Sequence, residues 1–163
     1  MDKEDKQFKI LIKMSFNEEL LGELYKKFAR KFGEYSKFWQ NISNEELKHA
    51  AWIRRIADEM LEGRVTFNEN KLIIKGINNF TDQIQESIKK ADESDFNELK
   101  AISTSRILES SLLEYKCFDV VKTNTQYLKE LLNNLRLDTK RHLKTIEEKW
   151  EKVRKAEGIK DFE

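Results

Sequence analysis

Acidic and imidazole side chains recur at matched spacing in the two halves of this chain. In the first half, Glu18 is followed by Glu46 and His49, and the last two form a Glu-x-x-His step. The second half contains Glu109 and His142, and the chain has no histidine besides His49 and His142. Residues three apart on a helix project from one face. Because mixed carboxylate and imidazole ligands suit Fe(II), Mn(II) or Zn(II), the pattern predicts a metal centre.

One carboxylate of the familiar two-metal ligand set is absent from the second half. Di-iron carboxylate bundles use one Glu from each of two helices and a Glu-x-x-His step from each of two more. Here Thr139 stands three residues before His142, where the second step needs its Glu. Asp138 lies one residue away, about 100° around a helix, and would reach the site only if that helix rotated. A site for a single metal ion, or a weak site, is therefore an alternative to a di-iron centre.

The elements that would position these side chains are predicted from apolar residues spaced three and four apart. The predicted helices cover residues 6–32, 36–62, 70–91, 96–122 and 126–154. Gly33 and Gly63 are expected to end the first two helices, since glycine adopts the left-handed conformation without strain. Residues 64–69 are a predicted loop, with a hairpin over residues 65–74 as the alternative because Val, Thr, Phe and Ile favour strands. With no proline in the chain to break a helix, we predict an all-α fold.

The predicted turns fall where a shared site requires them. Ligands on two antiparallel helices lie at one height only if the turn is midway between them. The midpoint between Glu18 and Glu46 is residue 32, and the midpoint between Glu109 and Thr139 is residue 124, inside the predicted turn 122–125. Since a helix rises ~1.5 Å per residue, a turn misplaced by about six residues would separate the ligands by roughly 18 Å.

Two capping boxes are an alternative interpretation of the same segments. Ser15-Phe-Asn-Glu18 and Ser43-Asn-Glu-Glu46 both fit the Ser-x-x-Glu pattern that starts a helix. If both were caps, Glu18 and Glu46 would lie at different heights. Against this, the apolar stripes continue upstream of both serines, which favours positions in the middle of a helix, at Phe8, Leu11, Trp39 and Ile42.

Composition limits the class of protein. The chain has 163 residues, enough for a single domain over residues 1–163 with a real core. Lys and Arg total 31 against 30 for Asp and Glu, so there is no electrostatic case for nucleic acid or an anionic membrane as partner. The apolar run at residues 8–16 is too short to span a bilayer and lacks the features of a signal peptide. The single Cys117 excludes an internal disulfide and favours a reducing, cytoplasmic setting.

Four segments of the chain resemble the ferritin-like superfamily, and specifically its rubrerythrin-like branch, at residues 18–29, 38–50, 107–109 and 137–143. The interval of seven from Glu18 to Tyr25 and the Glu-x-x-His-Ala step at Glu46 are typical of the first helix pair in that branch. The resemblance extends over residues 9–150. It implies an antiparallel four-helix bundle with a helical crossover between its second and third helices, supplied here by residues 70–91.

By this resemblance the metal ligands would be Glu18, Glu46, His49, Glu109 and His142, holding one or two iron ions. Family members use a non-haem di-iron centre to oxidise Fe(II) with oxygen or peroxide, or to reduce peroxide. Oxidoreductase chemistry on Fe(II), O2 or peroxide is thus the activity to expect, and by analogy a homodimer is the expected assembly. The chain departs from the family at Thr139, at Leu112, where rubrerythrin has a second Glu, and in lacking the paired cysteines of a rubredoxin domain.

The alternative is a ferritin-like bundle that has lost its metal chemistry and acts as a structural or partner-binding module. Burying an unpaired carboxylate costs several kcal/mol, so the inward glutamates need partners in either case. Without a metal they would pair with protonated histidine or with another polar side chain, for which the candidates are Arg54, Arg55, Arg106, Lys116 and Tyr25.

Overall fold

The computed structural model describes residues 2–114 and 116–159, which form five α-helices and one short strand pair. The helices are α1 (Lys3–Lys31), α2 (Ser36–Leu61), α3 (Lys71–Lys90), α4 (Glu98–Glu114) and α5 (Gln126–Ala156). The strands β1 (Thr66–Phe67) and β2 (Val121–Lys122) pair in antiparallel fashion. The prediction of an all-α fold is therefore confirmed. Within the described residues, none of the helices combines the length and apolarity needed to cross a membrane.

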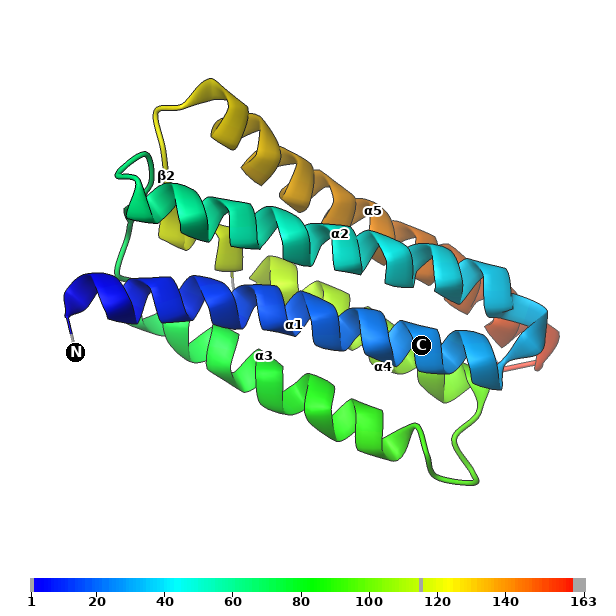
Figure 1. The fold of residues 1–163 in the computed structure, drawn as a ribbon. Coiled ribbons are helices and arrows are strands. Elements are labelled where there is room, and N and C mark those ends of the chain that lie inside the picture. The colour runs from blue at the N-terminus through cyan, green and yellow to red at the C-terminus, as the bar shows by residue number, and fades with distance from the viewer. Residues whose placement is uncertain (1, 115, 160–163) are drawn as a thin grey trace.

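The helices lie lengthwise beside one another (Figure 1). The most extensive contact is between α1 and α2, which a 3₁₀ turn at Gly33–Tyr35 joins at one end of the molecule. The second extensive contact is between α4 and α5, while α3 packs mainly on α1. From the end of α2, the chain passes through β1 into α3, and α3 runs back along the molecule to the opposite end, where α4 begins (Figure 1). As a result, α2 and α4 run in the same direction.

Small residues allow α1 and α2 to approach closely near their middles. A Cβ atom added to Gly22 would lie 3.1 Å from Leu47 Cδ2 and 3.4 Å from the carbonyl oxygen of Ser43, so a side chain at this position would displace the Leu47 side chain by a few tenths of an ångström. Ser43 Oγ donates to the carbonyl of Gly22 at 2.7 Å, and Ser15 Oγ donates to the carbonyl of Ala50 at 2.9 Å. Both serines thus join facing helices from mid-helix positions, and the capping-box interpretation is wrong.

The predicted helix over residues 96–122 is too long. In the structure α4 ends at Glu114, Lys116 takes a left-handed φ of 48°, and residues Cys117–Val120 form a 3₁₀ turn before β2. Val121, the first residue of β2, is β-branched and favours the extended backbone, although the apolar residues here also fit a helical stripe.

Residues 64–69 are not simply a loop, and the alternative hairpin over residues 65–74 is also wrong. Thr66 and Phe67 do form a strand, but they pair with Lys122 and Val121, far along the chain. Local sequence does not reveal a pairing between segments so distant from each other. The pair connects the end of α2 to the segment that precedes α5.

The two glycines expected to end helices behave differently. Gly63 has a left-handed φ of 74° after α2, and its N–H donates to the carbonyl of Met60 at 3.0 Å. At the end of α1, Phe32 leaves the helical conformation, with φ −116° and ψ 80°, and Gly33 opens the 3₁₀ turn without a positive φ. The left-handed stop expected at Gly33 is therefore wrong, because the chain has already left the helix one residue earlier.

Asn70 fixes the start of α3. Its Oδ1 accepts from the N–H of Leu72 at 3.0 Å and of Ile73 at 3.3 Å. We expect Asn70→Ala to lower the free energy of unfolding by about 1 kcal/mol, because two amides of the first turn lose their acceptor. Urea denaturation measures this change, with Asn68→Ala as a nearby exposed control. An equal loss in both variants would contradict the capping role.

Candidate metal centre

Four helices bring the five predicted ligand residues together. Glu18 lies on α1, Glu46 and His49 on α2, Glu109 on α4 and His142 on α5, and none is more than 2% exposed. Glu46, His49 and His142 each offer one possible ligand atom, and these three atoms lie within 4.8 Å of one another. The two imidazole rings stack with centroids 5.5 Å apart. The Glu109 Oε1 atom is 3.9 Å from His142 Nδ1, and Glu18 interacts with the carboxylate of Glu46.

The Glu46 carboxylate lies between the two histidines. Its Oε2 is 2.9 Å from His49 Nδ1, and its Oε1 is 2.7 Å from His142 Nδ1. The second contact lacks the alignment of a hydrogen bond, so Glu46 Oε1 and His142 Nδ1 are both buried without a hydrogen-bond partner among the described residues, as is Glu109 Oε2. Two atoms bound to one metal ion at about 2.1 Å lie about 3 Å apart when the angle at the metal is near 90°. The unpaired atoms therefore have a spacing compatible with a shared cation.

The outer nitrogen of each histidine faces a second carboxylate, which comes from the helix opposite. His49 Nε2, on α2, is 3.0 Å from Asp138 Oδ2 on α5. His142 Nε2, on α5, is 2.5 Å from Glu45 Oε2 on α2. Arg141 donates to both carboxylates, at 2.7 Å to Glu45 and 3.0 Å to Asp138. Burial opposes ionisation of these carboxyls, but the histidines and Arg141 hold both pKa values below their usual range.

Sequence reasoning missed the role of Glu45 and misjudged that of Asp138. Asp138 does contact the site, but at its rim and through the outer nitrogen of His49, without entering the centre. Thr139 is buried, and its Oγ1 donates to the carbonyl of Leu135 at 2.9 Å. Among the residues that the structure describes, none therefore replaces the missing carboxylate at position 139. A signal for both residues was present in the sequence, because each histidine has an acidic residue four positions before it, Glu45 before His49 and Asp138 before His142.

Charge in the centre is balanced by protons. Burial and the negative charge of Glu46 raise the pKa of Glu18 well above its usual range and the pKa of Glu109 to about 8. Burial also disfavours ionised Glu46, but the charges of His142 and His49 and their close contacts lower its pKa instead. Burial would likewise lower the pKa of His142, yet Glu46 and Glu109 raise it to about 10. A divalent cation would replace these protons, since metal ligands bind in their deprotonated forms.

Aromatic side chains contact two residues of the centre, Glu109 and His49. Tyr25 OH donates to Glu109 Oε1 at 2.7 Å, and the Tyr25 ring stacks on Trp39 with centroids 5.6 Å apart. The ring of Trp52 lies 5.6 Å from that of His49. A cavity of about 10 Å³ borders Glu18, which is room for about one water molecule.

Of the residues proposed as partners in a metal-free network, only Tyr25 contacts the centre in the structure described. Arg54 pairs with Glu19, and Arg55 pairs with Glu59 at 2.7 Å. The guanidinium of Arg106 lies over the ring of Trp150 at 4.9 Å. Lys116 is exposed, in the turn that follows α4. The inward glutamates are thus left with one another, the histidines and a single tyrosine.

The chain matches no family model, and neither the curated proteins nor the solved structures include a significant match. What the centre does must therefore be inferred from its donor atoms, which are oxygen and nitrogen. Burial and the neighbouring charge of Glu18 raise the pKa of the Cys117 thiol to about 12, so this thiol stays protonated and is a poor metal ligand. A buried group of Glu46, His49 and His142 can hold a metal ion, and its chemistry suits Fe, Mn or Zn.

Proposed function

We propose that this chain is a ferritin-like protein of the rubrerythrin-like kind that binds one or two transition-metal ions in its core. Iron is the expected metal, and the expected ligands are Glu18, Glu46, His49, Glu109 and His142. The helix order supports this assignment, because α3 connects the helix pair α1–α2 to the pair α4–α5 along the length of the molecule (Figure 1). A helical crossover of this kind is what a ferritin-like bundle requires.

One observation carries the proposal. Both imidazoles direct Nδ1 at the shared carboxylate of Glu46 and Nε2 at an outer carboxylate, Asp138 or Glu45. Metal-binding histidines characteristically donate their other ring N–H to such an acceptor, which fixes the tautomer and leaves the inner nitrogen free for the ion. The unaligned contact between His142 Nδ1 and Glu46 Oε1 is also better suited to two ligands of one ion than to a hydrogen bond.

Bound iron would supply one-electron redox chemistry with O2 or peroxide. The residues around it would hold it, neutralise its charge and exclude bulk water. Tyr25 fixes the orientation of Glu109 through its hydrogen bond. The cavity beside Glu18, at about 10 Å³, has room for about one water molecule and no room for an organic substrate. In the oxidation of Fe(II), the iron itself donates the electrons that reduce O2 or peroxide. This reaction therefore requires no separate electron-donor domain.

Metal content tests the proposal directly. We expect the protein, loaded with Fe(II) under anaerobic conditions and then desalted, to retain at least about one ion per chain by elemental analysis. Parallel loading with Mn(II) and Zn(II) identifies the preferred metal. Failure to retain any of the three would overturn the proposal.

A metal-free structural or partner-binding module is the second candidate, and two observations favour it. Thr139 offers no carboxylate, and both ring nitrogens of His49 already have partners, at 2.9 Å in Glu46 and 3.0 Å in Asp138. A satisfied network of this kind can persist without an ion. Under this candidate, metal content after loading stays near zero and added metal leaves the melting temperature unchanged.

A further inference from the structure

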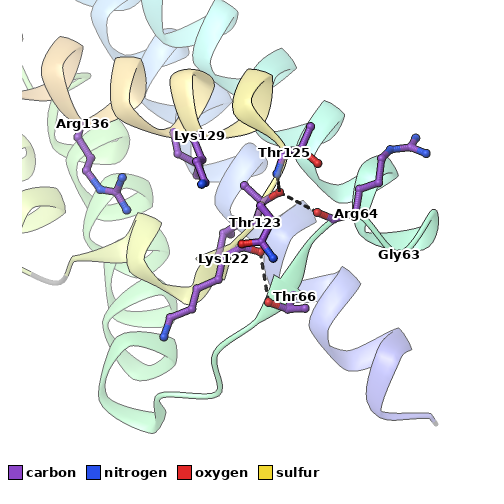
Figure 2. Close-up of a pocket in the computed structure, with 11 residues that line it drawn as sticks. Gly63, Arg64, Thr66, Lys122, Thr123, Thr125, Lys129 and Arg136 are labelled. Atoms are coloured by element: carbon purple, nitrogen blue, oxygen red, sulfur yellow. Dashed lines mark hydrogen bonds between the residues drawn. The ribbon is translucent and has the colours of Figure 1, made fainter.

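A second candidate site lies at the end of the molecule where α5 begins (Figure 2). It is a cavity of about 750 Å³, a size typical of small-molecule sites. Its walls are the turn after α2, the segment that contains β2, and one face of α5. The residues that line it include no carboxylate and four cations, which are Arg64, Lys122, Lys129 and Arg136.

The walls of this cavity are joined by hydrogen bonds between segments distant in sequence. Thr66 Oγ1 donates to the carbonyl of Lys122 at 3.3 Å, and Thr123 Oγ1 donates to the carbonyl of Arg64 at 2.7 Å (Figure 2). The N–H of Thr125 then donates to Thr123 Oγ1 at 3.1 Å. Together with the β1–β2 pair, these bonds fix the cavity in advance, so a ligand would not have to order it.

The four cations differ in how far their charges are already neutralised. Arg64 is bonded to Glu59, and Figure 2 shows its guanidinium pointing away from the other three side chains. Arg136 forms an ion pair with Asp119 at 2.9 Å. By contrast, Lys122 and Lys129 are exposed and form no ion pair or side-chain hydrogen bond within residues 2–114 and 116–159. Two ammonium groups at this cavity are thus free to bind an anion.

The start of α5 lies beside this cavity. Thr125, the N-cap residue, makes no side-chain capping bond to the first turn of the helix. Amides at a helix N-terminus attract anions through their free N–H groups and the helix dipole. Thr125 and Lys129 both line the cavity, one helical turn apart. The lining of the cavity thus includes Thr125, Lys122 and Lys129 but none of the first-turn residues 126–128.

We propose that this cavity binds a small molecule through a diphosphate or larger phosphate group. Lysine binds phosphate as a point charge, and two unpaired lysines call for a ligand with at least two negative charges. A volume of about 750 Å³ exceeds the needs of a single orthophosphate and leaves room for a diphosphate and an organic substituent. None of these residues belongs to the candidate metal centre, so the two proposals stand independently.

Inorganic pyrophosphate is the probe that tests this site. We expect saturable binding of pyrophosphate to metal-free protein by isothermal titration calorimetry at fixed ionic strength. Lys122→Gln combined with Lys129→Gln should weaken it by at least about tenfold, because the variant loses two charge-assisted contacts to the ligand. Both lysines are exposed, so the variant should keep its fold, which circular dichroism checks.

Matched variants separate a site from general charge attraction. Lys144→Gln combined with Lys152→Gln removes the same charge from exposed positions further along α5 and should change the affinity by less than about twofold. Tighter binding of ATP than of pyrophosphate would assign the site to an organic phosphate, and the reverse order to an inorganic diphosphate. Equal losses in the two double variants, or no saturable binding of pyrophosphate by the unaltered protein, would overturn the proposal. The metal-loading result is unaffected by either outcome.

Discussion

Replacing Glu46 with alanine should abolish metal retention, the largest effect we expect from any single substitution in this chain. The Glu46 carboxylate contacts the inner nitrogen of both histidines, at 2.9 Å and 2.7 Å, so its removal takes an oxygen ligand from the middle of the site. Loss of an outer hydrogen-bond partner already weakens metal affinity by about 10–100-fold, and loss of a ligand should exceed that. Elemental analysis after loading and desalting measures the change.

Two matched variants serve as controls for the metal retention of Glu46→Ala. Glu59→Gln alters another buried carboxylate of α2, one that pairs with Arg55 and Arg64 outside the centre, and should retain the metal. Asp138→Asn should weaken the affinity by about 10–100-fold, because it alters the acceptor at the outer nitrogen of His49 without removing a ligand. Full metal retention by Glu46→Ala would show that the ion binds elsewhere.

Metal binding should also stabilise the fold strongly. A ligand that binds only the folded state at 100 times its dissociation constant adds about 2.7 kcal/mol to the free energy of unfolding. For a chain of this size each kcal/mol shifts the melting temperature by about 2–4 °C, so the expected rise is roughly 5–11 °C. Thermal unfolding followed by circular dichroism, with Zn(II) or Mn(II) to avoid redox chemistry, measures it.

The same melting experiment distinguishes the centre from adventitious metal binding. Glu46→Ala should show almost no rise, whereas Glu59→Gln should show the full rise, because only the former alters the centre. A similar shift in both variants would place the ion outside the buried group. No shift in the unaltered protein would favour the metal-free module.

Much of the fold follows from local pattern alone. The apolar periodicity located α1, α2, α3 and α5 because each helix buries one stripe along its length. The spacing of Glu18, Glu46, His49, Glu109 and His142 also predicted their burial at one level, since turns near the midpoints place antiparallel ligands at matching heights.

What local pattern missed depends on contacts between distant segments. The early end of α4 is followed by a 3₁₀ turn and by β2, whose pairing with β1 no periodicity within either segment indicates. The outer carboxylates Glu45 and Asp138 fell outside the predicted site because each serves the histidine of the facing helix. Their roles depend on how α2 and α5 are rotated relative to each other about their axes. The spacing of residues along the sequence does not determine that rotation.

The pairing of each histidine with a carboxylate of the facing helix affects how the helices assemble. The strong helix contacts lie within α1–α2 and within α4–α5, whereas α2 and α5 touch much less. Polar contacts therefore connect the pair α1–α2 to the pair α4–α5 at three points. Two join α2 to α5, Glu45 with His142 and His49 with Asp138, and the third joins Tyr25 of α1 to Glu109 of α4. Sliding one half along the other by a single turn, about 5.4 Å, would break all three at once. The buried polar group thus sets the register in which the two halves assemble, whether or not an ion is present.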